Sequence, residues 1–174
     1  MNYHTLPLAL EQRFERTADL AVSLYAANSH LNAEQIRQRP GSCAKITVIQ
    51  WMLLRELGTD AMFMRSGNRT RPHIFLGYQD EFIERTYSDT TWQQFLEGDT
   101  HDKPATLLFS ASRAQEQLGS MAVQPDIWSI WTDAHEGPID LPTILAFSPQ
   151  VARVFEKRRW PQHSLNGPTN VAYY

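Results

Sequence analysis

The segment from Cys43 to Leu57 constrains the fold of this chain more than any other part of the sequence. Apolar residues cover most of its circumference when it is drawn as a helix: Ile46, Val48, Ile49, Trp51, Met52, Leu53, Leu54 and Leu57. A helix that is apolar nearly all round is packed on nearly all sides. Gly58 follows as a left-handed cap that ends the helix. The segment is therefore predicted to be the central helix of a hydrophobic core.

Two helices are predicted before this segment and a set of short strands after it. Helical spacing of apolar residues predicts an amphipathic helix from Leu8 to Asn28, and Asn32 with Gln35 predicts a capping box before a short helix that Pro40 stops. The expected later elements are strands at Asp60–Arg65, His73–Tyr78 and Phe82–Tyr87, a helical turn at Trp92–Leu96, a strand at Ala105–Phe109, and helices at Ser110–Leu118 and Ser148–Arg159. The segment Ser120–Leu145 has no clear pattern. The order predicts an α+β fold with a central antiparallel sheet.

The length of the chain limits it to one ordinary domain. With 174 residues it can bury one full hydrophobic core, but it is too short for two domains of usual size. We therefore expect residues 1–174 to form a single domain. Weak patterning from Pro161 to Tyr174 predicts a peripheral tail over 161–174.

Composition argues against several classes of function. A net charge of −3 gives no electrostatic reason to expect a nucleic acid or an anionic membrane as a partner. No run approaches the ~18 apolar residues that span a bilayer, and the first twenty residues do not have the pattern of a signal peptide. A single cysteine allows no intramolecular disulfide and no thiolate-rich metal site. These features indicate a cytoplasmic protein, or an effector that is exported without a cleaved signal.

The only cysteine, Cys43, lies where a nucleophile would be favoured. It falls in the first turn of the predicted helix, where unpaired backbone N–H groups and the positive end of the helix dipole favour an anion. The small residues Gly41 and Ser42 precede it and would let a substrate carbonyl approach the backbone. We therefore assign Cys43 as the candidate nucleophile, with Gly41 and Ser42 as candidate substrate-binding residues.

A thiol nucleophile needs a base, and His73 at the beginning of a predicted strand is the candidate. If the following hairpin turn is Gln79-Asp80, the register puts His73 opposite Thr86. Glu84 is then the diagonal neighbour on the same face, roughly 7–8 Å away, and is the candidate acid that orients the imidazole. A longer loop would change the register, so Asp89, just beyond the strand, is the reserve candidate.

These segments carry a family resemblance. GSCAKITVIQWMLLRELGTDAMFMRSG resembles the nucleophile helix and following strand of the transglutaminase-like superfamily, within the papain-like class. PHIFLGYQDEFIERTY resembles its histidine strand and the strand that carries the acid, although Glu84-Arg85-Thr86 stands where the family has Asp-Pro-Thr. The resemblance covers about residues 41–87. It implies a papain-like core, with the nucleophile helix packed on a small antiparallel sheet, and a Cys43–His73–Glu84 triad.

The implied activity is acyl transfer from a carboxamide of a protein or peptide through a thioester: amide hydrolysis, glutamine deamidation or proteolysis. Transfer to an amine in peptide biosynthesis is an alternative, and an inert binding module of the same fold is another. Trp128 is a candidate for the substrate groove, although packing in the core is the simpler role for it. Gln38 lies one residue too close to Cys43 to match the oxyanion glutamine of papain. No cofactor and no metal site are expected, because the histidines lack ligand spacing.

Overall fold

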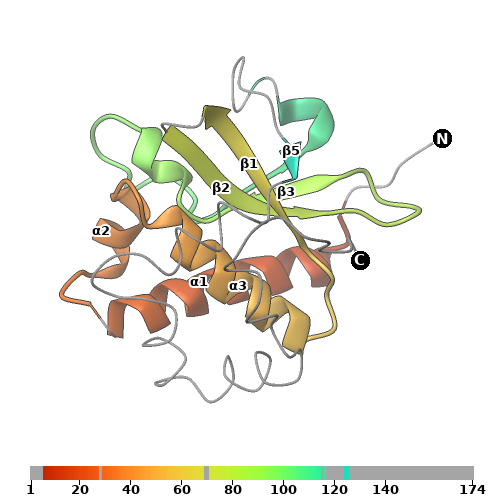
Figure 1. Cartoon of the computed structure of the whole chain (residues 1–174), viewed down its shortest axis with the longest axis horizontal. Helices are drawn as coiled ribbons and strands as arrows, with labels where there is room; N and C mark the ends of the chain where they lie inside the picture. Colours follow the sequence, from red (N-terminus) through yellow and green to blue (C-terminus); the bar gives the residue numbers. More distant parts are fainter. Residues whose placement is uncertain (1–5, 28, 69–70, 115, 117–123, 126–174) are drawn as a thin grey trace, which may run out of the picture.

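Three α-helices come first in the computed structural model, which describes residues 6–27, 29–68, 71–114, 116 and 124–125. They are α1 (Leu8–Ala27), α2 (Ala33–Gln38) and α3 (Cys43–Glu56) (Figure 1). Their bounds agree with the predicted helices to within a residue or two. The predicted capping box of α2 is confirmed, since Asn32 and Gln35 each accept the other's backbone N–H at 2.9 Å.

An antiparallel sheet follows the helices. Its strands lie in the order β4-β3-β2-β1-β5, and β5 is only two residues long. The bounds are β1 Met62–Asn68, β2 Arg71–Tyr78, β3 Thr86–Asp89, β4 Leu107–Ser110 and β5 Gln124–Pro125, with the 3-10 helices η1 at Trp92–Phe95 and η2 at Ala111–Arg113. The fold is therefore α+β, as predicted. No helix among the described residues combines the length and apolar character needed to cross a membrane.

Some of the predicted elements differ from the structure or lie outside the described residues. The turn η2 stands where a helix over Ser110–Leu118 was expected, and residues 115, 117 and 118 lie outside the described residues. Other predictions also lie outside the described residues. They are the helix Ser148–Arg159, the tail 161–174, Trp128, and the segment Ser120–Leu145 apart from Gln124 and Pro125.

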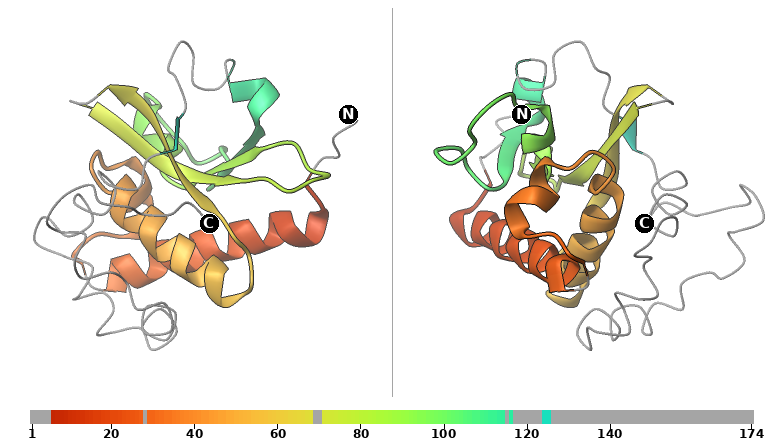
Figure 2. Two further views of the ribbon diagram at one scale, coloured as in Figure 1. Left: turned by 45° about the vertical axis from the view of Figure 1, so that its right-hand side comes forward. Right: turned by 90° about the vertical axis from the view of Figure 1, so that its left-hand side faces the viewer.

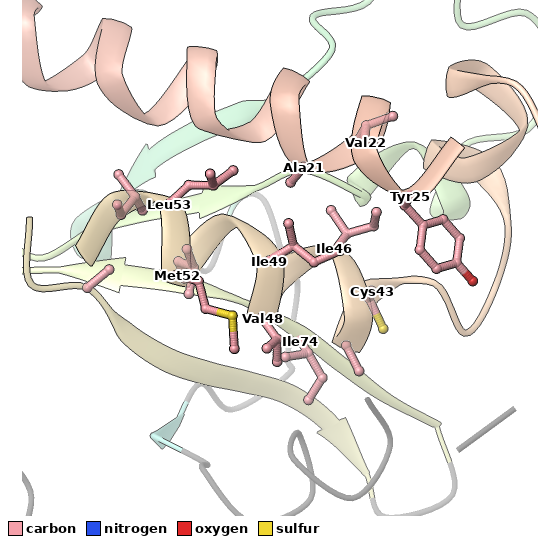
Figure 3. Packing of buried hydrophobic residues seen from close by; sticks show 14 of the residues in the cluster. Ala21, Val22, Tyr25, Cys43, Ile46, Val48, Ile49, Met52, Leu53 and Ile74 are labelled. Atoms are coloured by element: carbon pink, nitrogen blue, oxygen red, sulfur yellow. The ribbon is translucent and has the colours of Figure 1, made fainter. Parts of the chain in front are cut away.

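The helix α3 is the centre of the core, as its apolar circumference predicted. It packs against α1 on one side and against β2 on the other, and every residue from Cys43 to Gln50 is buried (Figure 2). Figure 3 shows Cys43 at the beginning of α3, at one end of the buried row that continues through Ile46 and Ile49. The nucleophile candidate is therefore fixed by the most heavily packed element of the fold.

Side chains alternate between the two faces of the sheet. Phe63, Ile74 and Leu76 belong to the large core that contains α3. The neighbouring residues Met64 and Phe75 belong to a second cluster, together with Tyr87 of β3 and Phe109 of β4. Both faces of the sheet therefore carry buried apolar side chains, and β2 is held from both.

The predicted register between β2 and β3 is wrong. The structure pairs Leu76 with Ser88 and Tyr78 with Thr86, whereas the short turn would have put Thr86 opposite His73. Residues 79–85 form a longer loop, because Asp80 Oδ1 accepts the backbone N–H groups of both Phe82 and Ile83 at 2.8 Å. The longer loop shifts every partner of β2 by five residues along the chain.

Candidate active site

The beginning of α3 lies beside the beginning of β2. Thr47, one turn after Cys43, donates its hydroxyl to the backbone carbonyl of Ile74 at 3.2 Å. Ile74 directly follows His73 in β2. This hydrogen bond, which is buried, therefore fixes the first turn of the helix next to the histidine.

The cap of α3 leaves its first turn without a side-chain partner from the cap residue. Ser42 donates its hydroxyl back to the carbonyls of Ile36 at 2.7 Å and Arg39 at 2.9 Å, and it makes no capping hydrogen bond. Gly41 has a φ of +88°, a left-handed conformation that favours glycine. The sharp Gly41-Ser42 turn thus holds α2 against α3 and does not cap the amides beside Cys43, which suits them to bind an anion.

His73 is buried and has a partner at each ring nitrogen. Its Nε2 lies 2.5 Å from Oδ2 of Asp89, and its Nδ1 lies 2.9 Å from the side-chain amide nitrogen of Gln94. The imidazole and Asp89 are only 2% and 1% exposed. Phe95 packs its ring edge-on to the imidazole at 4.6 Å between centroids, and Phe75 lies at 5.5 Å. The ring is therefore held by polar contacts in its plane and by aromatic contacts around it.

The electrostatic surroundings keep His73 protonated. Burial alone would lower its pKa, but the charge and hydrogen bond of Asp89 and the hydrogen bond and charge of Cys43 raise the pKa to about 10. An imidazolium between a carboxylate and a thiol is the arrangement that stabilises a thiolate.

Hydrogen bonds within the segment and to the helices α2 and α3 hold Asp89, Thr90 and Thr91 in place. The second carboxylate oxygen of Asp89 accepts the backbone N–H of Thr91 at 3.1 Å. Thr90 donates its hydroxyl to Oε1 of Gln50 in α3 at 2.9 Å, and its carbonyl accepts from the buried guanidinium of Arg37 at 3.3 Å. These contacts leave Asp89 little freedom to turn away from the imidazole.

The prediction that Glu84 contacts His73 is wrong. Glu84 accepts the backbone N–H of Ser112 at 2.7 Å, beyond the end of β4. The five-residue shift in register removes Glu84 from the neighbourhood of His73. Asp89, the reserve candidate, is the carboxylate that the structure brings to the imidazole.

Gln38, which the sequence analysis compared with the oxyanion glutamine of papain, has partners other than Cys43. Gln38 donates its amide to Glu34 at 3.2 Å and to Thr100 at 2.8 Å, so it is engaged elsewhere. Within the described ranges, no group of three or more His, Cys, Asp or Glu side chains could hold a metal ion.

Sequence reasoning missed Gln94 and Phe95. A helical turn was predicted there, but nothing in the sequence indicates that this turn packs beside the histidine.

Comparison with known proteins identified no similar protein. No family model, no curated protein and no solved structure matches this chain.

The raised pKa of His73 predicts how stability depends on pH. A group whose pKa is higher in the folded state stabilises the fold fully below its unfolded value, near 6.5, and loses this effect as the pH rises through about 10. The free energy of unfolding of the wild type should therefore exceed that of Asp89→Asn by an amount that shrinks between about pH 7 and pH 10. Urea unfolding of both proteins across this range measures the difference. A difference that stays constant or grows with pH would show that Asp89 does not hold an imidazolium.

Proposed function

We propose that this chain is a thiol-dependent acyl-transfer enzyme with a papain-like, transglutaminase-like core, acting on a carboxamide of a protein or peptide. One observation carries the proposal: a buried imidazole that hydrogen-bonds to Asp89, and whose pKa is raised both by that carboxylate and by Cys43, which begins the central helix. Cysteine, histidine and carboxylate in this order of contact form the triad by which thiol enzymes activate their nucleophile.

The first half of the reaction forms a thioester. The Cys43 thiolate attacks the carbonyl carbon of the carboxamide, and the electron pair of the C=O bond moves to oxygen. Backbone N–H groups in the first turn of α3 bind this oxyanion. The oxyanion then returns its electron pair, the C–N bond breaks, and Nδ1 of His73 gives its proton to the departing nitrogen. Asp89 holds the ring in orientation throughout.

The second half of the reaction decides the product. His73, now neutral, removes a proton from a water molecule, whose oxygen attacks the thioester and releases a carboxylic acid and the Cys43 thiolate. Attack by an amine in place of water gives transfer. We favour water as the acceptor, which gives amide hydrolysis, glutamine deamidation or proteolysis of a protein or peptide.

An inert binding module of the same fold is the competing hypothesis. Its motivation was the Glu84-Arg85-Thr86 sequence in place of the usual acid motif. The contact between Asp89 and His73 removes that motivation, because a carboxylate is present at the imidazole. This contact favours the enzyme.

An activated ester tests the proposal without knowledge of the natural substrate. Incubation with p-nitrophenyl acetate should give a burst of nitrophenol, and mass spectrometry of the quenched protein should find an acetyl group, about 42 Da, on the peptide that contains Cys43. Absence of both the burst and the adduct would contradict the proposal. With a candidate substrate, a gain of about 1 Da indicates deamidation, and chain scission indicates proteolysis.

A further inference from the structure

Phe95 is an exposed aromatic residue that contacts the buried imidazole of His73. Among the phenylalanine, tyrosine and tryptophan side chains that the structure describes, only Phe82 and Phe95 are exposed, at 68% and 55%. Single exposed apolar side chains are common on protein surfaces and need no explanation by themselves. Phe95 is set apart by its contact, because its ring packs edge-on to His73 with 4.6 Å between the centroids.

The other described neighbours of the imidazole shield it from solvent. Asp89 and Phe75 are buried, like the imidazole itself, and Gln94 is half-buried. Phe95 is therefore the most exposed of the described side chains that contact the ring in its plane or around it. A substrate that approaches the imidazole past its most exposed neighbour lies against the Phe95 ring.

The turn that carries Phe95 is fixed to the rest of the fold. In η1, the indole N–H of Trp92 and the side-chain amide of Gln93 both donate to the backbone carbonyl of Pro104 at 3.1 Å. The backbone carbonyl of Gln93 also accepts the N–H of Leu96 at 3.1 Å, which closes the turn. An anchored turn presents the Phe95 ring, so little conformational freedom is lost when a ligand packs on it.

The proposed reaction brings one part of the substrate to this ring. The departing nitrogen takes its proton from His73, so it lies within hydrogen-bond distance of the imidazole when the C–N bond breaks. A side chain carried by this nitrogen then lies near the Phe95 ring, which contacts the same imidazole. An exposed aromatic ring suits an apolar side chain, because their contact removes apolar surface of both from water.

We propose that Phe95 is a substrate-binding residue on the leaving-group side of the site, where its ring receives an apolar side chain of the departing amine. This inference rests on the proposed function and narrows it. A departing amine with an apolar side chain comes from a peptide bond, whereas the ammonia released from a glutamine side chain has nothing to place on the ring. The substrate class is therefore a peptide with an apolar residue directly after the cleaved bond, and the reaction is proteolysis.

Interception of the acetyl-enzyme by amines tests this site, because an amine that attacks the thioester follows the path of the departing amine in reverse. p-Nitrophenyl acetate forms the acetyl thioester on Cys43. The nitrogen of an added amine attacks the thioester carbon, the C–S bond breaks with its electron pair on sulfur, and His73 takes the proton that the amine loses. Phenylalanine amide and glycine amide, added together at equal concentration, differ only in the benzyl side chain. Mass spectrometry of the two N-acetyl products gives their ratio.

The wild type should acetylate phenylalanine amide about three- to tenfold more than glycine amide, the effect of one aromatic contact. In Phe95→Ala the ratio should fall to within about twofold of unity. Phe95→Gln, which replaces the ring by a polar side chain, should lose the preference as well, so the test does not depend on the folding of the alanine variant. A change in the orientation of the imidazole would affect both products equally and leave their ratio unchanged.

Phe82→Ala is the matched control. Phe82 is also an exposed phenylalanine, but it lies in the loop after Tyr78, at the other end of β2 from His73, so its removal should leave the ratio within about twofold of wild type.

Three results would overturn the inference: a wild-type ratio near unity, a preference that Phe95→Ala and Phe95→Gln retain, or no acetylated phenylalanine amide at high amine concentration. Failure of the proposed function looks different, because the wild type would then give no burst of nitrophenol and no adduct on Cys43. A normal burst with an unselective wild type contradicts the apolar site alone.

Discussion

Cys43→Ala should abolish acyl turnover while the protein remains folded. In the proposed mechanism the Cys43 thiolate forms the thioester, so its removal would leave only binding and the oxyanion site. Loss of a nucleophile typically lowers turnover by about 10⁶-fold. The fold should tolerate the change, because Cys43 is buried at one end of the core and alanine fills most of its volume. Steady-state release of nitrophenol from p-nitrophenyl acetate measures the loss, and circular dichroism checks the fold.

Cys43→Ser is a useful companion to this variant. It keeps the size of the side chain but replaces the thiol by a hydroxyl, which ionises far less readily, so turnover should remain negligible. Turnover in folded Cys43→Ala at more than a few per cent of the wild-type rate would exclude Cys43 as the nucleophile.

Asp89→Asn should lower turnover by about 10³- to 10⁴-fold, whereas Glu84→Gln should leave it within about twofold of wild type. Asparagine keeps the shape of the side chain, but it removes the charge that stabilises the imidazolium and that raises the pKa of His73. Glu84 is the matched control, because it also accepts a hydrogen bond but from the backbone of Ser112. Turnover of p-nitrophenyl acetate by both variants, with NMR titration of His73, measures the two effects.

The opposite ranking would contradict the assigned triad. A large loss in Glu84→Gln with little loss in Asp89→Asn would return the orienting role to Glu84. In the titration, an unchanged midpoint of His73 in Asp89→Asn would show that the carboxylate does not determine the protonation of the ring.

The sequence was sufficient to predict the helices α1, α2 and α3 and the position of Cys43 at the beginning of α3. In α3 the apolar residues cover the helix all round, and Gly58 has the left-handed φ of +76° expected of a cap. The capping box of Asn32 and Gln35 is equally local. Such features depend on residues within a few positions of each other, so a single sequence reveals them.

The carboxylate partner of His73 depended on information that the sequence did not provide. The loop over residues 79–85 owes its length to the contacts of Asp80 with the following backbone, and a two-residue turn was equally compatible with the residue types. The diagonal relation between histidine and acid was the right principle. Applied to the observed pairing of Leu76 with Ser88, it leads to Asp89. The contact between Gln94 and His73 follows only from the packing of η1 beside the histidine.

Titration of the His73 imidazole tests the central claim, an imidazolium that both Asp89 and Cys43 stabilise. In the native wild type the ring should stay protonated through pH 8, because these two residues raise its pKa to about 10. The midpoint should fall in Cys43→Ala, and in the urea-unfolded chain it should lie near 6.5, the ordinary value for histidine. NMR of the imidazole measures each midpoint. A native wild-type midpoint near 6.5, or one that Cys43→Ala leaves unchanged, would contradict the claim.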